Sequence, residues 1–537
     1  MNVPLTPLRF LRYANDQFRN KVGVVCGSER FTYSQMSDRC SRLAGALAAI
    51  GAQPGDRVAF LSTNCHRLLE AYYGVLEAEC VLLPLNIRLS AQELSFVLND
   101  SKAKFLFFER QFLPLVDALR GSIPSVCTFF MLDGHADVDW VASESYEDML
   151  MAATGLRCDI MRVDEDSLAE LFYTSGTSDK PKGVMLSHRN IYLHALSVIA
   201  AFQTSPQLAG QMTSETVVLH TIPLFHANGW GFAHTVTLLG GTHVMIHHFN
   251  PAEVFELVQR EKVWICALVP TMANALVHSP DRSKHDLTSL RSIMIGGAAS
   301  SAHLVKEVEE KLGGTCISGY GLTETSPVLA FSPLKQSMDW QGDLRHNRQA
   351  MTGFAIPGVE IRVIDADEND VRHDGVAIGE VAARGDAVMQ GYWGQPNLTE
   401  DTLAGGWFHT GDVATIDEEQ YVLIVDRKKD IIVSGGENIS SLEVEKVLAS
   451  HPAVFEAVVI PVPDEKWGEV PKAVVVLKPG AMASEGEVLD FCRSRLAHYK
   501  SPHSVEFVDS LPKTGTGKLM KKELRERYAS VSRNFVS

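Results

Sequence analysis

Hydrophobic positions follow two different spacings along the first part of the chain. In the segment 33–51 apolar side chains recur at the spacing of an amphipathic helix, and the pattern ends at Gly51, where a C-cap glycine is expected. Short apolar runs typical of strands follow at 57–61, 80–85 and 104–108, and a second helical pattern lies between the first two, at 66–79. Strands that alternate with helices in this way predict an α/β architecture with largely parallel sheets.

The pattern changes in the last third of the sequence. From 353 to 425 short apolar runs separated by turn residues predict a smaller β-rich subdomain. After the charged segment 426–430 helical and strand patterns mix again, and Ser484 with Glu487 predicts the capping box of one helix. About 110 residues of such a pattern are enough for a separate domain. The sequence therefore predicts a large N-terminal domain (1–425, β-rich subdomain about 353–425) and a small α+β C-terminal domain (426–537).

Composition and charge exclude several classes of protein. A chain of 537 residues is too long to form a single hydrophobic core, so two or more domains are expected. The formal net charge of −16 argues against a nucleic-acid partner, because such binding needs clustered positive charge. No stretch reaches the roughly 18 apolar residues of a membrane span, and nine cysteines without a C-x-x-C pair suit reduced thiols. We therefore expect a cytoplasmic protein without an integral membrane segment.

Two loops have the composition of phosphate-binding loops without the Walker A spacing. In 173–184, YTSGTSDKPKGV, the second glycine precedes Val, and in 512–519, PKTGTGKL, the lysine precedes Leu, where Walker A requires Lys and then Ser or Thr. An apolar run precedes the first loop and a helical pattern follows it, with Ser187 as a good N-cap. This order predicts strand, loop and helix, which would aim backbone N–H groups at an anion. A solvated surface turn is the alternative that composition alone leaves open.

The two loops and six further segments occur in an order that resembles the adenylate-forming superfamily, which contains acyl-CoA synthetases, peptide-synthetase adenylation domains and beetle luciferases. Within it the chain is most similar to fatty acyl-CoA synthetases. The resemblance covers nearly the whole chain, and its other segments are PLFHANGW (223–230), GGAAS (296–300), GYGLTET (319–325), GEVAARGDAVMQGYW (379–393), WFHTGD (407–412) and DRKKDIIVSGGENIS (426–440). One such motif is weak evidence, whereas eight in the family order are very specific.

The resemblance implies an ATP-dependent ligase with a C-terminal domain that rotates about a hinge. A carboxylate would attack the α-phosphate of ATP to give an acyl-adenylate and pyrophosphate. A thiol, usually that of coenzyme A, would then displace AMP. Because the reaction occurs at the α-phosphate, the first loop would hold the leaving pyrophosphate, which explains why the Walker A template does not fit.

The resemblance also implies that most candidate residues bind ATP. Tyr320 would stack on adenine, and Asp412, supported by Arg427, would accept hydrogen bonds from the ribose hydroxyls. Because Mg²⁺ prefers hard oxygen ligands, Glu324 and the Thr174 hydroxyl are the implied metal ligands. The full set implied for ATP and coenzyme A is Thr174, Ser175, Gly176, Thr177, Lys182, Gly297, Ala298, Tyr320, Gly321, Thr323, Asp412, Arg427 and Gly436. A surface carboxylate at Glu324 and a turn residue at Asp412 are the alternatives.

Four residues would act on the reacting groups: Lys518, His226, Thr323 and Glu324. Lys518, on a glycine-containing arm, would stabilise the negative charge that develops at the α-phosphate. Its alternative is a solvated lysine near the C-terminus. His226 would lie near the carboxylate of the acid and Trp230 would gate the acyl pocket, although a tryptophan here could also be plain core. Lys429 occupies the position of the hinge.

The acid itself is the least determined part of this interpretation. The apolar residues after Trp230 suit a medium- or long-chain aliphatic carboxylic acid, and whether aromatic acids are accepted stays open. Two other functions stay open on the same scaffold: an acyl-AMP ligase that loads a carrier protein, and a catalytically inactive sensor of ATP or an acyl ligand. The sequence also leaves monomer and homodimer open.

Overall fold

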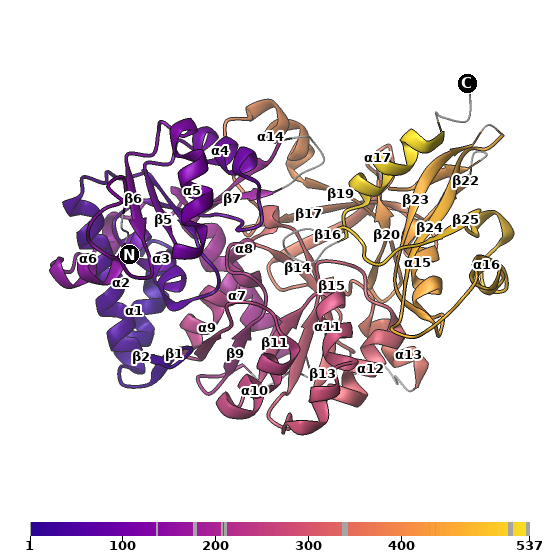
Figure 1. Cartoon of the computed structure of the whole chain (residues 1–537), viewed down its shortest axis with the longest axis horizontal. Coiled ribbons are helices and arrows are strands. Elements are labelled where there is room, and N and C mark those ends of the chain that lie inside the picture. The colour runs from indigo at the N-terminus through magenta and orange to yellow at the C-terminus, as the bar shows by residue number, and fades with distance from the viewer. Residues whose placement is uncertain are drawn as a thin grey trace.

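The computed structural model describes residues 2–135, 138–174, 180–205, 208, 212–335, 342–428, 430–434, 437–464, 466–513 and 519–532. Two large sheets form the N-terminal part (Figure 1). The nine-stranded sheet has the order β15 (Phe354–Ala355), β14 (Val328–Phe331), β13 (Thr315–Gly321), β12 (Ser292–Ile295), β11 (Ile265–Leu268), β9 (Val217–His220), β10 (Thr242–Met245), β1 (Val22–Cys26) and β2 (Glu29–Thr32). The seven-stranded sheet has the order β18 (Gly391–Tyr392), β8 (Lys182–Ser187), β7 (Leu168–Thr174), β4 (Val81–Pro84), β3 (Arg57–Leu61), β5 (Phe105–Phe108) and β6 (Thr128–Met131).

Both sheets are parallel in their centres; the nine-stranded sheet is antiparallel at both edges and the seven-stranded sheet at its β18–β8–β7 edge. β1, β10, β9, β11, β12 and β13 pair in parallel, as do β6, β5, β3, β4 and β7. The α/β architecture expected from the sequence is therefore confirmed. Central strands such as β3 and β11 are almost continuously apolar because helices cover both of their faces.

Helices bury the faces of these sheets in separate apolar clusters. Between the two sheets lie α1 (Leu8–Gln17), α2 (Tyr33–Ala49), α3 (His66–Glu77) and α6 (Tyr146–Ala152), while α4 (Ala91–Asp100) and α5 (Leu113–Leu119) cover the outer face of the seven-stranded sheet. The outer face of the nine-stranded sheet packs against α10 (Pro251–Glu261), α11 (Pro270–Val277) and α12 (Ala302–Leu312). Its inner face packs against α7 (His188–Thr204), the short α8 (Ala227–Trp230) and α9 (Phe232–Leu239). Among the described residues, none of the helices combines the length and apolar character needed to cross a membrane.

Two smaller sheets complete the fold. An antiparallel four-stranded sheet has the order β16 (Val359–Ile364), β17 (Gly379–Gly385), β19 (Phe408–Ile416) and β20 (Val422–Arg427). The helices α13 (Asp343–Gln349) and α14 (Pro396–Thr402) lie before and within this stretch of chain. The C-terminal sheet contains β22 (Glu437–Ile439), β21 (Ile432–Ser434), β24 (Gly468–Leu477), β23 (Val454–Asp464) and β25 (Ser504–Phe507), and carries α15 (Ser441–Ala449), α16 (Glu485–Arg493) and α17 (Lys521–Ser532). This unit lies at one end of the molecule, in orange and yellow in Figure 1.

Hydrogen bonds tie the C-terminal unit to the end of β20. The Asp426 carboxylate, only 1% exposed, accepts hydrogen bonds at 2.7 and 2.5 Å from the backbone N–H and the hydroxyl of Ser441, at the start of α15. The hydroxyl of Ser440 donates to the carbonyl of Val425. The chain between these partners contains Lys429, the predicted hinge, which lies outside the described residues.

One local prediction is wrong. The first phosphate-like loop does not lead directly into a helix, because the strand β8 comes between them and pairs antiparallel with β7. In the segment Lys182–Ser187 only Lys182 and Met185 are partly exposed, and the apolar Val184 and Leu186, two residues apart, lie on one face of the strand. Ser187 is the N-cap of α7, as expected, and forms a capping box with Asn190. The loop is therefore the turn of a β-hairpin, and the N-terminus of α7 lies at the far end of β8.

We predict that Gly353→Ala destabilises the fold strongly. Gly353 has a φ of +92°, exchanges hydrogen bonds with Val422, and a Cβ atom here would lie 1.8 Å from the carbonyl oxygen of Phe331. Backbone strain and the clash together should lower the free energy of unfolding by about 3 kcal/mol or more. Gly406→Ala is the control, because Gly406 also has a positive φ but open space around it, and it should cost only about 1–2 kcal/mol. Equal losses in thermal unfolding of the two variants would contradict the prediction.

Candidate active site

The candidate residues gather at one edge of the nine-stranded sheet. β12 and β13 are parallel neighbours, and their carboxyl ends lead into Gly296–Gly297 and into Tyr320–Gly321. The 3₁₀ turn η5 (Thr323–Thr325) follows directly and holds Thr323 and Glu324. The carboxyl edge of a parallel sheet is where ligands bind in open α/β folds.

Asp412 joins this edge to the four-stranded sheet. The Tyr320 hydroxyl donates to Oδ2 of Asp412 at 2.7 Å, and Nε of Arg427 lies 2.5 Å from Oδ1. Asp412 and Arg427 are direct partners in the β19–β20 register, so the sheet itself sets their ion pair. Desolvation and the neighbouring carboxylate hold the pKa of Tyr320 well above its usual value, so the phenol stays a hydrogen-bond donor. The structure therefore brings Tyr320, Asp412 and Arg427 together as one unit.

A second unit forms around Glu324. The Tyr392 hydroxyl donates to Oε1 of Glu324 at 2.9 Å, and the ammonium of Lys182 lies 5.3 Å from the centroid of the Tyr392 ring. Burial, and next the Glu324 carboxylate, raise the pKa of Tyr392, which keeps its hydroxyl protonated. The sequence analysis gave Tyr392 no role, although it lies within the quoted segment 379–393. Only the pairing of β18 with β8 places it beside Lys182.

The phosphate-like hairpin begins and ends at this unit. Thr174 and Lys182 are direct partners in the β7–β8 register, so the turn between them starts with a hydroxyl and ends with an ammonium. Ser175, Gly176 and Thr177 lie outside the described residues.

Two glycines at this edge lie in close contact with neighbouring segments of the chain. A Cβ atom on Gly321 would lie 1.7 Å from the carbonyl oxygen of Pro327, so no larger residue fits there. Gly297 has a φ of +76° and faces the Trp230 ring, which a Cβ atom would approach to 3.4 Å. Ala298 follows Gly297 and is exposed. Gly321 and Gly297 therefore allow close packing between segments of the chain at this edge.

Trp230 lies within a turn of unusual backbone conformation, and His226 directly precedes that turn. Every residue from Ala227 to Gly231 has a positive φ, and the Gly231 N–H donates to the Ala227 carbonyl at 3.3 Å, which closes one turn of left-handed helix. Each non-glycine residue in this conformation costs about 1–2 kcal/mol. The Trp230 side chain is buried, and a Cβ atom on Gly296 would lie 3.0 Å from its ring. His226 is half-buried directly before the turn.

The residues present fit ATP with Mg²⁺. Tyr392 occupies one oxygen of Glu324, and the other has no hydrogen bond within the described part of the chain. A nucleotide-bound Mg²⁺ needs few protein oxygens, so Glu324 with the Thr174 hydroxyl is an adequate set. No group of three or more His, Cys, Asp or Glu in the described ranges could hold a metal ion by itself. Lys518 and Gly436 lie outside the described residues.

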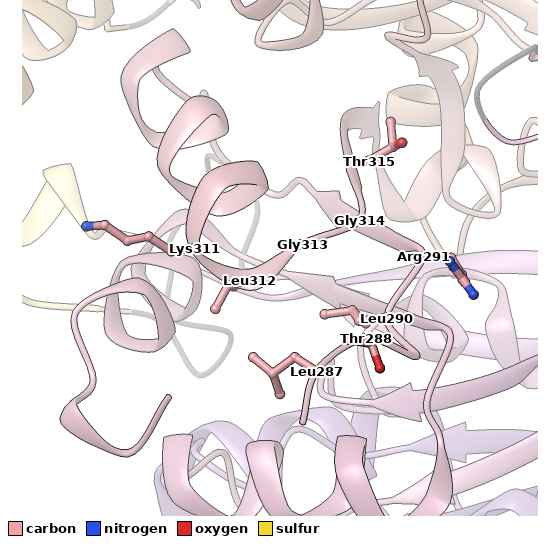
Figure 2. Close-up of a pocket in the computed structure, with 9 residues that line it drawn as sticks. All are labelled: Leu287, Thr288, Leu290, Arg291, Lys311, Leu312, Gly313, Gly314 and Thr315. Atoms are coloured by element: carbon pink, nitrogen blue, oxygen red, sulfur yellow. The ribbon is translucent and has the colours of Figure 1, made fainter. Parts of the chain in front are cut away.

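Two cavities lie elsewhere on the molecule. One of about 390 Å³ opens between the N-terminal part and the C-terminal unit, close to His226 in the chain, and is lined by Arg88, Pro223, Phe225, His247, His248 and Lys513 among others. The other, of about 590 Å³, lies at the amino ends of β12 and β13, opposite the candidate site. Figure 2 shows that its two charged side chains, Lys311 and Arg291, point away from one another, so they do not converge on a ligand.

The comparisons with known proteins agree with this geometry. The family model described as AMP-binding enzyme matches residues 11–393, and that of the AMP-binding enzyme C-terminal domain matches 443–518. The long-chain-fatty-acid–CoA ligase of Thermus thermophilus is 38% identical over 93% of this chain and 90% of its own length. The feruloyl-CoA synthase of an Amycolatopsis species is 37% identical over 94% of this chain and 95% of its own. The crystal structure of ATP-bound MatB from Rhodopseudomonas palustris matches with a TM-score of 0.84 at 29% identity, covering 98% of this chain and 99% of that one.

We predict that Asp412→Asn weakens ATP binding roughly 10- to 100-fold, because a charged acceptor contributes about 1.5–3 kcal/mol. Isothermal titration calorimetry with ATP measures the effect. Asp386→Asn is the matched control, since Asp386 is exposed and pairs only with Arg189 among the described residues, and it should leave the affinity unchanged. Wild-type affinity in the Asp412 variant would refute the assignment.

Proposed function

The chain belongs to the AMP-binding enzyme family and is an ATP-dependent, AMP-forming acid–CoA ligase, and we propose that its acid is a medium- or long-chain aliphatic carboxylate. The observation that carries the choice of acid is the position of Trp230. Its buried ring packs on Gly296 and Gly297, at the same sheet edge as Tyr320.

In the first half-reaction each unit of the site would take one part of ATP. Tyr320 would stack on adenine beside Gly297. The Asp412 carboxylate, which already accepts from the Tyr320 hydroxyl, would accept a further hydrogen bond from the ribose, and Arg427 would neutralise its charge. Lys182 and the hairpin that starts at Thr174 would hold the departing pyrophosphate. Mg²⁺, held through Glu324 and Thr174, would supply charge neutralisation on the phosphates.

The acid would approach the α-phosphate from the side of His226. A carboxylate oxygen attacks phosphorus and the bond to pyrophosphate breaks, so negative charge develops on the non-bridging oxygens. Thr323 and Lys518 would stabilise that charge, one from the turn after β13 and one from the C-terminal domain. The product at this stage is the acyl-adenylate.

In the second half-reaction a thiol displaces AMP. Coenzyme A carries several phosphate groups, and the cavity between the N-terminal part and the C-terminal unit is lined by Arg88, His247 and His248, and also by Lys513 in an ion pair with Glu456. This cavity also contains Phe225, one residue before His226, and we place the approach of coenzyme A there. Gly436 would leave room for the pantetheine arm after the C-terminal domain turns about Lys429.

An aliphatic acid suits the surroundings of Trp230. The ring belongs to a buried apolar cluster that also contains Ile222, Val269, Met294 and Ile317. Aliphatic side chains of this kind accept a hydrocarbon chain but offer no partner to a ring hydroxyl. The long-chain fatty acid of the Thermus relative supports this choice, while the aromatic acid of the Amycolatopsis relative is the alternative.

Wild-type enzyme with ATP, Mg²⁺ and coenzyme A should form thioester from octanoate or palmitate with a higher kcat/KM than from benzoate or ferulate. Trp230→Ala should raise the ratio of kcat/KM for palmitate over butyrate about tenfold, because removing the ring opens space for a longer chain. A preference for the aromatic acids would refute the aliphatic assignment. Pyrophosphate release without thioester would favour a carrier protein as acceptor.

Lys518→Ala should slow acyl-adenylate formation by about a thousandfold, as loss of a charge that stabilises the transition state does elsewhere. ATP affinity, and thioester formation from pre-made acyl-adenylate, should stay near wild type. Pyrophosphate exchange and single-turnover thioester formation measure the two halves separately. Equal losses in both would show a general defect instead of a role in the first half-reaction.

A further inference from the structure

The left-handed turn Ala227–Gly231 needs support from outside itself. Two of its five residues, Ala227 and Trp230, carry side chains that disfavour a positive φ, whereas Asn228 is of a type that tolerates it. Strained backbone of this kind persists only where the surrounding structure determines it, and it is concentrated at functional sites. The support must therefore come from contacts that fix these residues.

Glu170 makes that contact. It lies on β7 with its side chain fully buried, and its two oxygens bind two different parts of the turn region. Oε2 accepts from Nδ2 of Asn228 at 3.1 Å, in the middle of the turn. Oε1 lies 2.7 Å from Nε2 of His234, which is on α9 directly after the turn. One carboxylate thus connects the turn to the helix that follows it.

The partners of Glu170 are themselves held in place. The rings of Tyr72 and Tyr73 meet His234 edge-on at centroid distances of 5.5 and 5.6 Å, and the Tyr73 hydroxyl donates to the Ala233 carbonyl at 3.1 Å. On the other side the His194 ring fills the space beside Gly231, where a Cβ atom would lie 2.8 Å away. The turn therefore has one position relative to Glu170.

This contact is poorly suited to stability alone. Oδ1 of Asn228 and Nδ1 of His234 are buried without a hydrogen-bond partner within the described part of the chain. An apolar contact of the same shape would avoid that cost. What the polar contact adds is direction, because its hydrogen bonds fix how Asn228 is oriented, and Trp230 is two residues further along the same turn.

We propose that Glu170 is a positioning residue for acid selection: it holds Asn228 and His234, fixes the left-handed turn, and so sets where Trp230 lies at the acyl pocket. The inference rests on the proposed function. Glu170 is also on the strand that ends at Thr174. The same strand therefore supports the acid-selecting turn and starts the phosphate-binding hairpin.

Two substitutions test this role from opposite ends of the contact. Glu170→Gln keeps the size of the side chain but replaces one acceptor oxygen by an amide N–H₂, which cannot accept a hydrogen bond from Asn228 or His234. Asn228→Gly removes the side-chain bond while favouring the positive φ, so it separates the contact from backbone preference. Both should shift the ratio of kcat/KM for palmitate over octanoate by about tenfold in the same direction, with the KM for ATP unchanged. Pyrophosphate release measures both parameters.

Glu77→Gln is the matched control, because Glu77 is also a buried carboxylate but pairs with Arg12 and the Cys158 N–H, away from the turn. It should leave the ratio unchanged. In a Trp230→Ala background Glu170→Gln should have no further effect on the ratio, since its action runs through Trp230.

Two failures are distinguishable in this experiment. Wild-type enzyme that forms no thioester with these acids would refute the proposed substrate class. Wild-type activity with an unchanged ratio in both Glu170→Gln and Asn228→Gly would overturn the role of Glu170. Thermal unfolding of each variant identifies a variant that fails to fold, and the other then decides the result.

Discussion

The Asp412 carboxylate is the contact on which the arrangement of the site depends. It accepts from Tyr320, at the end of a strand of the nine-stranded sheet, and pairs with Arg427, on the neighbouring strand of the four-stranded sheet. A buried charge is stable only when its hydrogen bonds are satisfied, so the two sheets have to meet where both partners reach it. The need to satisfy one carboxylate therefore fixes how Tyr320 and Arg427 lie relative to one another.

Local sequence patterns predicted the parts of the fold that local forces determine. The strand at 57–61 and the capping box at Ser484 occur as expected, because alternation with helices and cap chemistry are read within a few residues. The strand Lys182–Ser187 was missed, because a short apolar run before a helix does not show that the run pairs antiparallel with the preceding strand β7. Pairing of this kind is a tertiary property.

The candidate site divides in the same way. Tyr320, Glu324 and Asp412 could be found because a family resemblance attaches to contiguous motifs. Tyr392 and Glu170 act only through partners that are far away in the sequence. A lone glutamate in the apolar run LAELF has no local signal of its role, and its burial beside Asn228 and His234 appears only once two separate segments are placed together. Motifs therefore identify candidate residues that lie within contiguous segments more readily than residues whose partners lie in distant segments.

Asp426 connects the C-terminal unit to the end of β20. Its buried carboxylate holds the first residue of α15 by two hydrogen bonds, across the stretch that contains Lys429. A turn of the C-terminal domain about that stretch would have to break both bonds and bring the carboxylate into water. The cost of such a rotation would therefore include the loss of both hydrogen bonds and the solvation of the carboxylate, and a Ser441→Pro variant would lack both bonds. If the domain rotates about this stretch, one buried aspartate beside Arg427 would contribute to the barrier between the two half-reactions.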